Sequence, residues 1–262
     1  MLKSINYNFS INGKGDPLFL IHGIGNTKNA WDYLLTKLTK HFTTIIYDLR
    51  GHGNYSKPEN KFELDDLVDD LEKIREITGF SKAHFAGHSL GGMIVPAYAR
   101  KYPQRIMSLV LLSTAAGRTQ EDTQNVFSII NAMEKQGVEK ILHTLVNRWF
   151  TDEFIKNNPE IIKKRLDQVL NTDKKNFLNV FRLYAETKMD SWLCEIKAPT
   201  LVLTGEKDMG CNPRMNKFIS TNIKNSKLII LPKYKHSILL ESPNEVAREI
   251  IKFISELKNK KY

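Results

Sequence analysis

The stretch GHSLGG at residues 87–92 decides how this chain is interpreted. It follows the apolar run Ala83–Ala86 and precedes a helix-like stretch from Met93 to Tyr102. A Gly-x-Ser-x-Gly pattern between a strand and a helix is typical of a sharp turn that holds a serine hydroxyl at the end of the strand. Such a turn presses its two outer glycines against neighbouring segments and leaves no room for a Cβ atom. Ser89 is therefore the candidate nucleophile.

A base and an acid that could activate this serine lie further along the chain. A serine hydroxyl needs a base that accepts its proton, and the base needs a third group that orients it. Enzymes with this turn carry the acid and then the histidine after the serine. The apolar run Thr200–Thr204 leads to Asp208, and the run Leu228–Leu231 leads to His236, with Glu206 as the nearest alternative acid. We expect His236 to act as the base and Asp208 to orient it.

The negative charge that develops on a reacting carbonyl oxygen needs N–H donors that are already in place. One donor is expected from the residue after the serine, Leu90, and the other from a loop that follows an early strand. The segment HGIGN at residues 22–26 follows the apolar run Leu18–Ile21. We assign the backbone N–H groups of Ile24 and Leu90 to this oxyanion hole. The segment lacks the glycine and lysine spacing of a phosphate-binding loop.

Short apolar runs alternate with helical patterns, which predicts an α/β fold with a mostly parallel sheet and helices on both faces. Residues 117–192 break the alternation, because they carry helical patterns and no strand pattern. We expect a core formed by residues 1–116 and 193–262, and a helical cap at 117–192 over the strand ends, where ligands of open α/β sheets bind. Strands are expected at Leu18–Ile21, Thr43–Tyr47, Ala83–Ala86, Met107–Leu112, Thr200–Thr204 and Leu228–Leu231, with an antiparallel edge strand near Tyr7–Ile11.

The composition excludes several classes of protein. The chain has 262 residues, of which 41% are hydrophobic and 26% are charged, and no apolar run approaches the roughly 20 residues of a membrane span. Its start lacks the apolar core of a signal peptide and it has only two cysteines, so we expect a cytoplasmic protein with reduced thiols. The formal net charge of +10 could attract an anionic partner. The basic residues are scattered, however, so nucleic-acid binding is not expected.

The chain has six histidines besides His236, and four of them lie in or beside the motifs and strands described above. His22 and His52 lie beside glycines, His84 lies within an expected strand, and His88 precedes the serine. We expect these four to be structural and hydrogen-bonded to the backbone, with the ring of His88 pointing away from the turn. No histidine pair has helical i, i+4 spacing and no cysteine pair has zinc spacing, so a metal site is not expected.

Together, these segments resemble the α/β-hydrolase superfamily over almost the whole chain. Within it, the chain is most similar to small cofactor-free members with a helical cap: carboxylesterases, 3-oxoadipate enol-lactonases and meta-cleavage C–C hydrolases. Haloalkane dehalogenases and epoxide hydrolases of this fold carry Asp where Ser89 stands, so those activities are disfavoured. Lys235 departs from the glycine that often precedes the catalytic histidine. The matching pieces are residues 22–25 with Trp31, DLRGHG at 48–53, GHSLGG at 87–92, Gly205–Asp208 with Pro213, and His236 with Glu241 and Pro243.

The resemblance and the residues together predict a serine hydrolase that cleaves a carboxylic ester or lactone of a small molecule. Two alternatives stay open: hydrolytic C–C cleavage by the same triad, and a ligand-binding or signalling protein on the same fold. The stretch RWFT at 148–151 is similar to the enol-lactonase group, so Arg148, Trp149 and Phe150 are candidate substrate-binding residues. Arg118 and Arg182 are further cap residues that could bind a substrate carboxylate.

Overall fold

The computed structural model describes residues 7–55, 58 and 61–259, so the opening residues considered above for a signal peptide lie outside the described part. Its centre is a seven-stranded sheet with the order β1-β3-β2-β4-β5-β6-β7. Strand β1 pairs antiparallel with β3, and the other neighbouring strands pair in parallel. The predicted α/β fold is confirmed. The strands are β1 (Phe9–Asn12), β2 (Asp16–Ile21), β3 (Phe42–Tyr47), β4 (Ala83–His88), β5 (Ile106–Leu112), β6 (Thr200–Gly205) and β7 (Ser226–Leu231).

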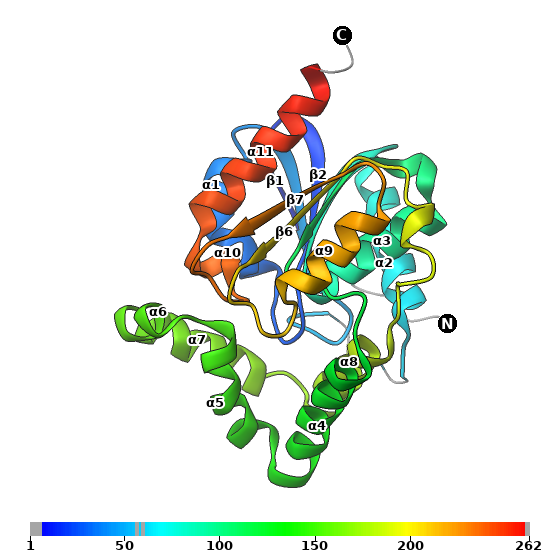
Figure 1. The fold of residues 1–262 in the computed structure, drawn as a ribbon. Helices are drawn as coiled ribbons and strands as arrows, with labels where there is room; N and C mark the ends of the chain where they lie inside the picture. Colours follow the sequence, from blue (N-terminus) through cyan, green and yellow to red (C-terminus); the bar gives the residue numbers. More distant parts are fainter. Residues whose placement is uncertain (1–6, 56–57, 59–60, 260–262) are drawn as a thin grey trace, which may run out of the picture.

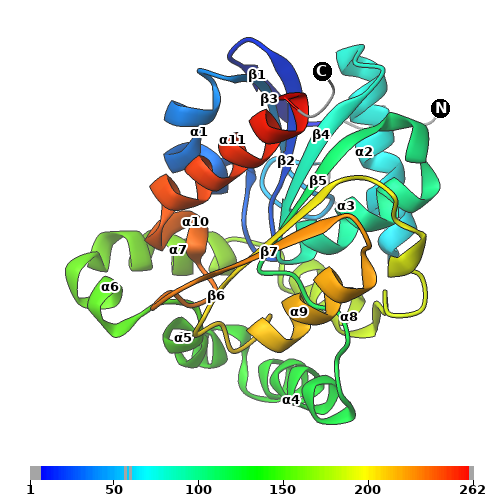
Figure 2. The same ribbon diagram turned by 45° about the horizontal axis from the view of Figure 1, so that its top comes forward.

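Both faces of the sheet are covered by helices (Figure 2). Successive strand residues point to opposite faces, so Phe19 and Phe85 belong to one apolar layer whereas Leu18 and Leu20 belong to the other. The first layer packs against α2 (Leu64–Thr78), α3 (Leu90–Lys101) and α9 (Pro213–Asn222). The second packs against α1 (Asp32–Leu38), α10 (Ile238–Glu241) and α11 (Pro243–Asn259). Burial on both faces explains why the strands read as continuous apolar runs.

Residues 117–192, which we call the helical insert, contain helices and no strand, and all of them are described. Helix α4 begins with a capping box, in which the Thr119 hydroxyl and the Asp122 carboxylate each accept the other's backbone N–H. The insert has an apolar cluster of its own that includes Leu142 and Phe177. Its helices are α4 (Gln120–Gln136), α5 (Val138–Trp149), α6 (Asp152–Asn157), α7 (Pro159–Leu170) and α8 (Lys174–Glu186).

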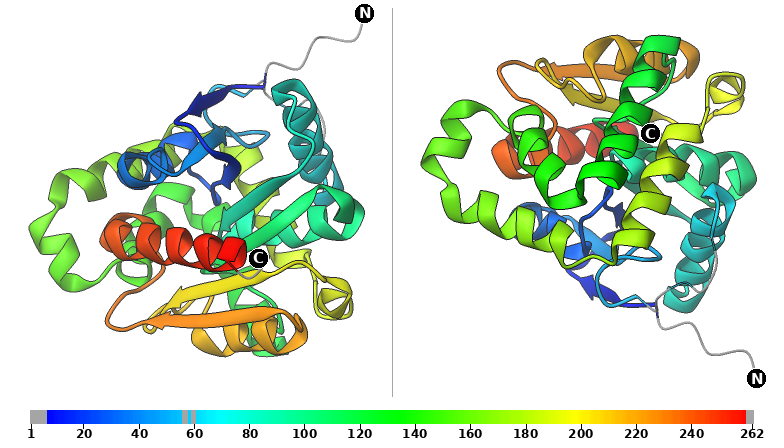
Figure 3. Two further views of the ribbon diagram at one scale, coloured as in Figure 1. Left: turned by 90° about the horizontal axis from the view of Figure 1, so that it is seen from above. Right: turned by 90° about the horizontal axis from the view of Figure 1, so that it is seen from below.

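The insert leaves the sheet after β5 and returns before β6. Figure 1 shows its green helices together below the sheet, and the right-hand view of Figure 3 shows them lying across one end of the molecule. The loops after β2, β4, β6 and β7 meet the insert at this end, since residues from all of them line one cavity with insert side chains. Within the described ranges, no helix combines the length and the apolar character that crossing a membrane requires.

Candidate active site

Ser89 sits in a strained turn between β4 and α3. Its backbone has φ 56° and ψ −114°, a conformation that costs a non-glycine residue about 1–3 kcal/mol. Its N–H donates to the carbonyl oxygen of Leu112 at 2.9 Å, which ties the turn to β5. A Cβ on Gly87 would lie 2.1 Å from the carbonyl oxygen of Gly91, and a Cβ on Gly91 would lie 2.2 Å from that of Ile21. Close packing therefore requires both glycines, as the sequence pattern predicted.

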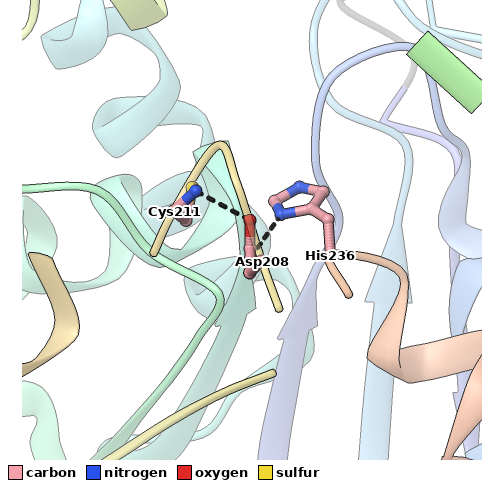
Figure 4. Close-up of side chains that lie close together, drawn as sticks. All are labelled: Asp208, Cys211 and His236. Atoms are coloured by element: carbon pink, nitrogen blue, oxygen red, sulfur yellow. Dashed lines mark hydrogen bonds and ion pairs between the residues drawn. The ribbon is translucent and has the colours of Figure 1, made fainter. Parts of the chain in front are cut away.

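Asp208 and His236 form a hydrogen-bonded pair on the loops that follow β6 and β7 (Figure 4). Nδ1 of His236 donates to Oδ2 of Asp208 at 2.8 Å. The other carboxylate oxygen accepts the backbone N–H groups of Gly210 at 2.9 Å and Cys211 at 2.8 Å. Asp208 is buried, with 2% of its surface exposed. Since Nδ1 carries the donated proton, Nε2 of His236 is the nitrogen that can accept another.

The two partners of this pair stabilise each other's charged forms. Burial would raise the pKa of Asp208, but the charge and hydrogen bond of His236 and the two backbone donors together hold it below its usual value. Burial also disfavours a charged His236, yet the Asp208 carboxylate outweighs burial and raises the pKa of His236 above its usual value. A raised pKa makes the imidazole a stronger proton acceptor. Glu206, the alternative acid, is exposed and instead accepts the backbone N–H of Lys233 at 3.2 Å.

Ser89 and His236 line the same cavity, which has a volume of about 120 Å³. One water molecule needs about 10–15 Å³ by this measure, so the cavity has room for a small organic molecule. The sheet side of the wall also includes Ile24, and the insert side is mainly apolar and aromatic. The insert residues in the wall are Val126, Ile129, Leu145, Arg148, Trp149, Arg165, Phe177, Phe181 and Tyr184.

Two buried histidines hold the loop that follows β2. Nε2 of His52 accepts the N–H of Gly25 at 2.9 Å, and Nε2 of His22 accepts the N–H of Leu49 at 3.0 Å. The other nitrogen of His22 donates to the carbonyl oxygen of Gly23 at 2.8 Å. Burial lowers the pKa of His22 to about 4 and that of His52 to about 3, so both rings are neutral at pH 7. Both histidines thus have the backbone partners that the sequence predicted.

The two residues whose N–H groups we assign to the oxyanion hole lie in different segments. Ile24 lies in the loop held by these histidines and lines the cavity. Leu90 follows Ser89 directly and is the first residue of α3, so its N–H has no partner within the helix. The side chain of Leu90 is buried in the core, which leaves only its backbone for such a role.

Comparison with known proteins finds similar hydrolases. A family model described as alpha/beta hydrolase fold matches residues 16–145. The chain is 26% identical to (E)-2-((N-methylformamido)methylene)succinate hydrolase of Acinetobacter baylyi, over 89% of this chain and 88% of that protein. The structure of this chain matches an enol-lactonase from Burkholderia xenovorans with a TM-score of 0.90 and 21% identity. The match covers 97% of this chain and 98% of the enol-lactonase chain. An esterase from Thermogutta terrifontis matches with a TM-score of 0.87 and 26% identity, covering 97% and 94%.

This chain has the α/β-hydrolase fold. The family resemblance predicted from the motifs is thereby confirmed, and the relatives named above are hydrolases.

His88 has a closer relation to the site of this α/β-hydrolase than its sequence position suggested. Its Nε2 donates to the carbonyl oxygen of His236 at 3.0 Å, and the two ring centroids lie 5.0 Å apart. The ring lines the cavity, and its bond to a backbone carbonyl oxygen is of the kind that the sequence predicted. For His84, the structure shows a hydrogen bond between Nδ1 and the hydroxyl of Ser108 at 2.7 Å.

The predicted substrate-binding residues of the insert separate into two groups. Arg148 and Trp149 line the cavity. Phe150 does not line it: the side chain is fully buried in another cluster and stacks on Phe154 with ring centroids 5.4 Å apart. The physical reason is that α5 ends at Trp149 and Phe150 has extended backbone angles. The side chain of Phe150 therefore does not continue the helix face that lines the cavity.

The other two predicted arginines also lie outside the cavity wall. Arg118 donates to the carbonyl oxygen of Tyr184 at 2.9 Å and lies over the ring of that residue. Arg182 pairs with Glu134. Neither belongs to the residues that line the cavity with Ser89.

The loop that carries His236 anchors the insert of this hydrolase. Lys235 donates through Nζ to a carbonyl oxygen of α5 at 2.7 Å, and the N–H of Ser237 donates to the carbonyl oxygen of Trp149 at 2.9 Å. The Glu241 carboxylate accepts both the backbone N–H and the hydroxyl of Thr151 at 2.7 Å. Lysine in place of the usual glycine therefore serves to hold the insert over the sheet.

Cys211 and Arg165 are among the cavity-wall residues that the sequence did not predict. Cys211 donates its N–H to Asp208, and its Sγ lies 3.3 Å from the hydroxyl of Tyr184. Arg165 reaches from α7 to the loop after β2, where it contacts the carbonyl oxygens of Ile24 and Gly25. Neither carried a signal in the sequence, since Cys211 belongs to no motif and Arg165 ends a short basic cluster on a helix.

Proposed function

We propose that the protein is a serine hydrolase that cleaves a carboxylic ester or lactone of a small molecule through an acyl-enzyme. The observation that carries the proposal is that strained Ser89 shares a cavity with His236, whose Nδ1 is bound to the buried Asp208. A histidine oriented by a carboxylate is the group that activates a serine hydroxyl. The enol-lactonase and esterase similarities support an ester or lactone as the bond cleaved.

In this mechanism, Oγ of Ser89 attacks the acyl carbon while Nε2 of His236 takes up the hydroxyl proton. The backbone N–H groups of Ile24 and Leu90 stabilise the oxyanion of the tetrahedral intermediate. His236 then gives its proton to the leaving oxygen, and the acyl group remains bonded to Ser89. A water molecule then attacks the acyl carbon while His236 takes up its proton. The bond to Oγ of Ser89 breaks, the acid is released, and His236 returns the proton to Oγ. Asp208 stays ionised throughout and stabilises the imidazolium.

The direct test is labelling with a fluorophosphonate probe together with turnover of p-nitrophenyl acetate and butyrate. We expect wild-type protein to be labelled and active. Ser89→Ala should abolish labelling, and Ser89→Ala and His236→Ala should each lower turnover by about 10³-fold or more. His41→Ala is the matched control, because this histidine is exposed and belongs to no part of the site; its activity should equal that of wild type.

Three outcomes distinguish the candidate functions. Failure of folded wild-type protein to react with the probe would contradict the proposal and favour a ligand-binding protein on this fold. Labelling without turnover of any ester or lactone would favour C–C bond hydrolysis by the same residues, which a meta-cleavage product would reveal. The cytoplasmic location, the division into core and cap, and the independence from nucleic acids stay predictions.

A further inference from the structure

The cavity wall is positively charged and lacks a compensating acid. Two arginines, Arg148 and Arg165, line the cavity, and none of the described residues in its wall is an aspartate or a glutamate. Desolvation lowers the pKa of Arg165, and no carboxylate within the described ranges counteracts it. Buried charges in proteins are normally paired. The missing partner of Arg165 is therefore expected to come from a bound ligand.

The guanidinium of Arg165 is held in a fixed orientation. Its Nη2 donates to the carbonyl oxygen of Ile24 at 3.1 Å and its Nη1 donates to that of Gly25. Its central carbon lies 5.1 Å from the ring centroid of Trp149. These contacts use only part of its set of N–H donors. Burial lowers the pKa of Arg165 to about 10, so the group is charged at neutral pH and is ready to bind an anion.

A purely structural role explains this arrangement poorly. Arg165 does tie α7 to the loop after β2, but two carbonyl oxygens carry only partial charge and cannot neutralise a guanidinium. Removing an uncompensated ion from water is unfavourable, and a neutral donor could make the same contacts without desolvating a charge. Much of the remaining wall is apolar, as at Ile129 and Leu145. The net charge of +10 would also attract anionic substrates from solution.

We propose that the enzyme acts on esters or lactones that also carry a carboxylate, and that Arg165 binds this carboxylate. Planar guanidinium and carboxylate groups match each other through paired N–H···O bonds, which would fix the scissile carbonyl relative to Ser89. The proposal rests on the proposed function for the reaction itself, and it adds the class of substrate and a specificity-determining residue.

The kinetic test compares two substrates of nearly equal shape: the mono-p-nitrophenyl ester of glutarate, which is anionic, and p-nitrophenyl glutaramate, which is neutral. Wild-type protein should have a higher kcat/KM for the anionic ester. Arg165→Gln should reduce the ratio of the two kcat/KM values by about 10- to 100-fold, the range expected for a hydrogen bond to a charged group. Arg165→Lys should retain part of the preference. Arg182→Gln is the matched control, since Arg182 lies in the same insert but outside the cavity wall, and should leave the ratio unchanged.

The ratio of the two kcat/KM values shows whether Arg165 binds the substrate carboxylate or only anchors the loop after β2. If Arg165→Gln lowers kcat/KM equally for both substrates, Arg165 only positions the loop and the proposal is wrong. It is also wrong if wild-type protein prefers the neutral ester, or if Arg148→Gln and not Arg165→Gln removes the preference. Melting temperatures and fluorophosphonate labelling of each variant show that the site is intact.

A binding measurement keeps this test independent of the chemistry. Glutarate is titrated calorimetrically into Ser89→Ala protein and into the Ser89→Ala/Arg165→Gln double variant. We expect binding to the first and an affinity at least about 10-fold weaker for the second, with the neutral diamide of glutaric acid failing to reproduce the difference. If wild-type protein neither reacts with the probe nor turns over esters, the proposed function fails, yet this titration still decides whether Arg165 binds a carboxylate.

Discussion

The two walls of the cavity differ in how their functional groups are held. On the sheet side, backbone contacts fix the groups: a strained turn holds Ser89, and two backbone N–H groups hold Asp208. On the insert side, long side chains such as Arg165 and Trp149 reach into the cavity from helices that are anchored by loop contacts. For the proposed reaction, this difference predicts that catalysis depends on the sheet edge and that substrate choice depends on how the insert docks.

The largest effect is expected on the sheet side, from Asp208→Asn. An asparagine would keep its oxygen toward the N–H groups of Gly210 and Cys211 and turn its NH₂ toward His236. His236 would then need an unprotonated Nδ1, so its Nε2 would carry the proton and could not accept one from Ser89. Loss of this tautomer lowers kcat by about 10⁴-fold.

Glu206→Gln is the control for Asp208→Asn, because Glu206 follows the same strand but is exposed and does not contact His236. Its kcat for p-nitrophenyl butyrate should stay within about twofold of wild type, as expected for an exposed residue outside the site. Equal losses in the two variants would contradict the assignment of Asp208.

The insert side should instead separate stability from binding at two adjacent residues. Phe150 is fully buried, so Phe150→Ala should lower the free energy of unfolding by about 3–5 kcal/mol. Trp149→Ala opens the cavity wall and should mainly raise KM, with a smaller loss of stability because Trp149 is only half-buried. Urea unfolding and ester kinetics measure the two effects. A larger stability loss in Trp149→Ala than in Phe150→Ala would reverse our placement of these side chains.

Two glycine substitutions test the same difference between the sheet side and the insert side. A Cβ at Gly91 would collide with the carbonyl oxygen of Ile21, so Gly91→Ala must shift the turn that carries Ser89. A displacement of about 1 Å in an active site can cost about 100-fold in rate. At Gly137, between α4 and α5, an added Cβ would have no neighbouring atom within 4 Å, but the backbone has a φ of 94°. Gly137→Ala should therefore lower the melting temperature through backbone strain while leaving kcat unchanged, and a comparable loss of kcat would contradict the distinction.

The same contrast explains which features the sequence predicted. The strands and the positions of Ser89, Asp208 and His236 follow from local rules: apolar runs form strands, and the turn after a parallel strand delivers its side chains to one edge. No local rule states which face of an insert helix meets the cavity. That choice depends on docking through Lys235 and Glu241, so Arg165 was missed and Phe150 was assigned to the wrong environment.

The smallest expected effect is the pH dependence of kcat/KM. It distinguishes His236, which is bound to a carboxylate, from the buried His88. Asp208 raises the pKa of His236 above its usual 6.5, so the neutral base becomes available only at higher pH. The kcat/KM for p-nitrophenyl butyrate should therefore rise with pH along a limb whose apparent pKa exceeds 6.5. Burial lowers the pKa of the neighbouring His88 to about 3, which keeps it neutral in the assay range.

The free energy of unfolding should depend on pH in opposite directions for the neutral buried histidines and for His236, which is bound to a carboxylate. His22, His52 and His88 are protonated below pH 6.5 in the unfolded chain but stay neutral in the folded protein down to about pH 4 or 3. The unfolded state then binds more protons, so stability falls as pH drops from 6.5 toward 4. His236 has a raised pKa, so its stabilising contribution is complete below 6.5 and is lost as pH rises through its folded pKa. If urea unfolding at pH 5 and pH 7 gave equal stability, the buried histidines would not be neutral, and the hydrogen bonds that we assign to the loop of Ile24 would be wrong.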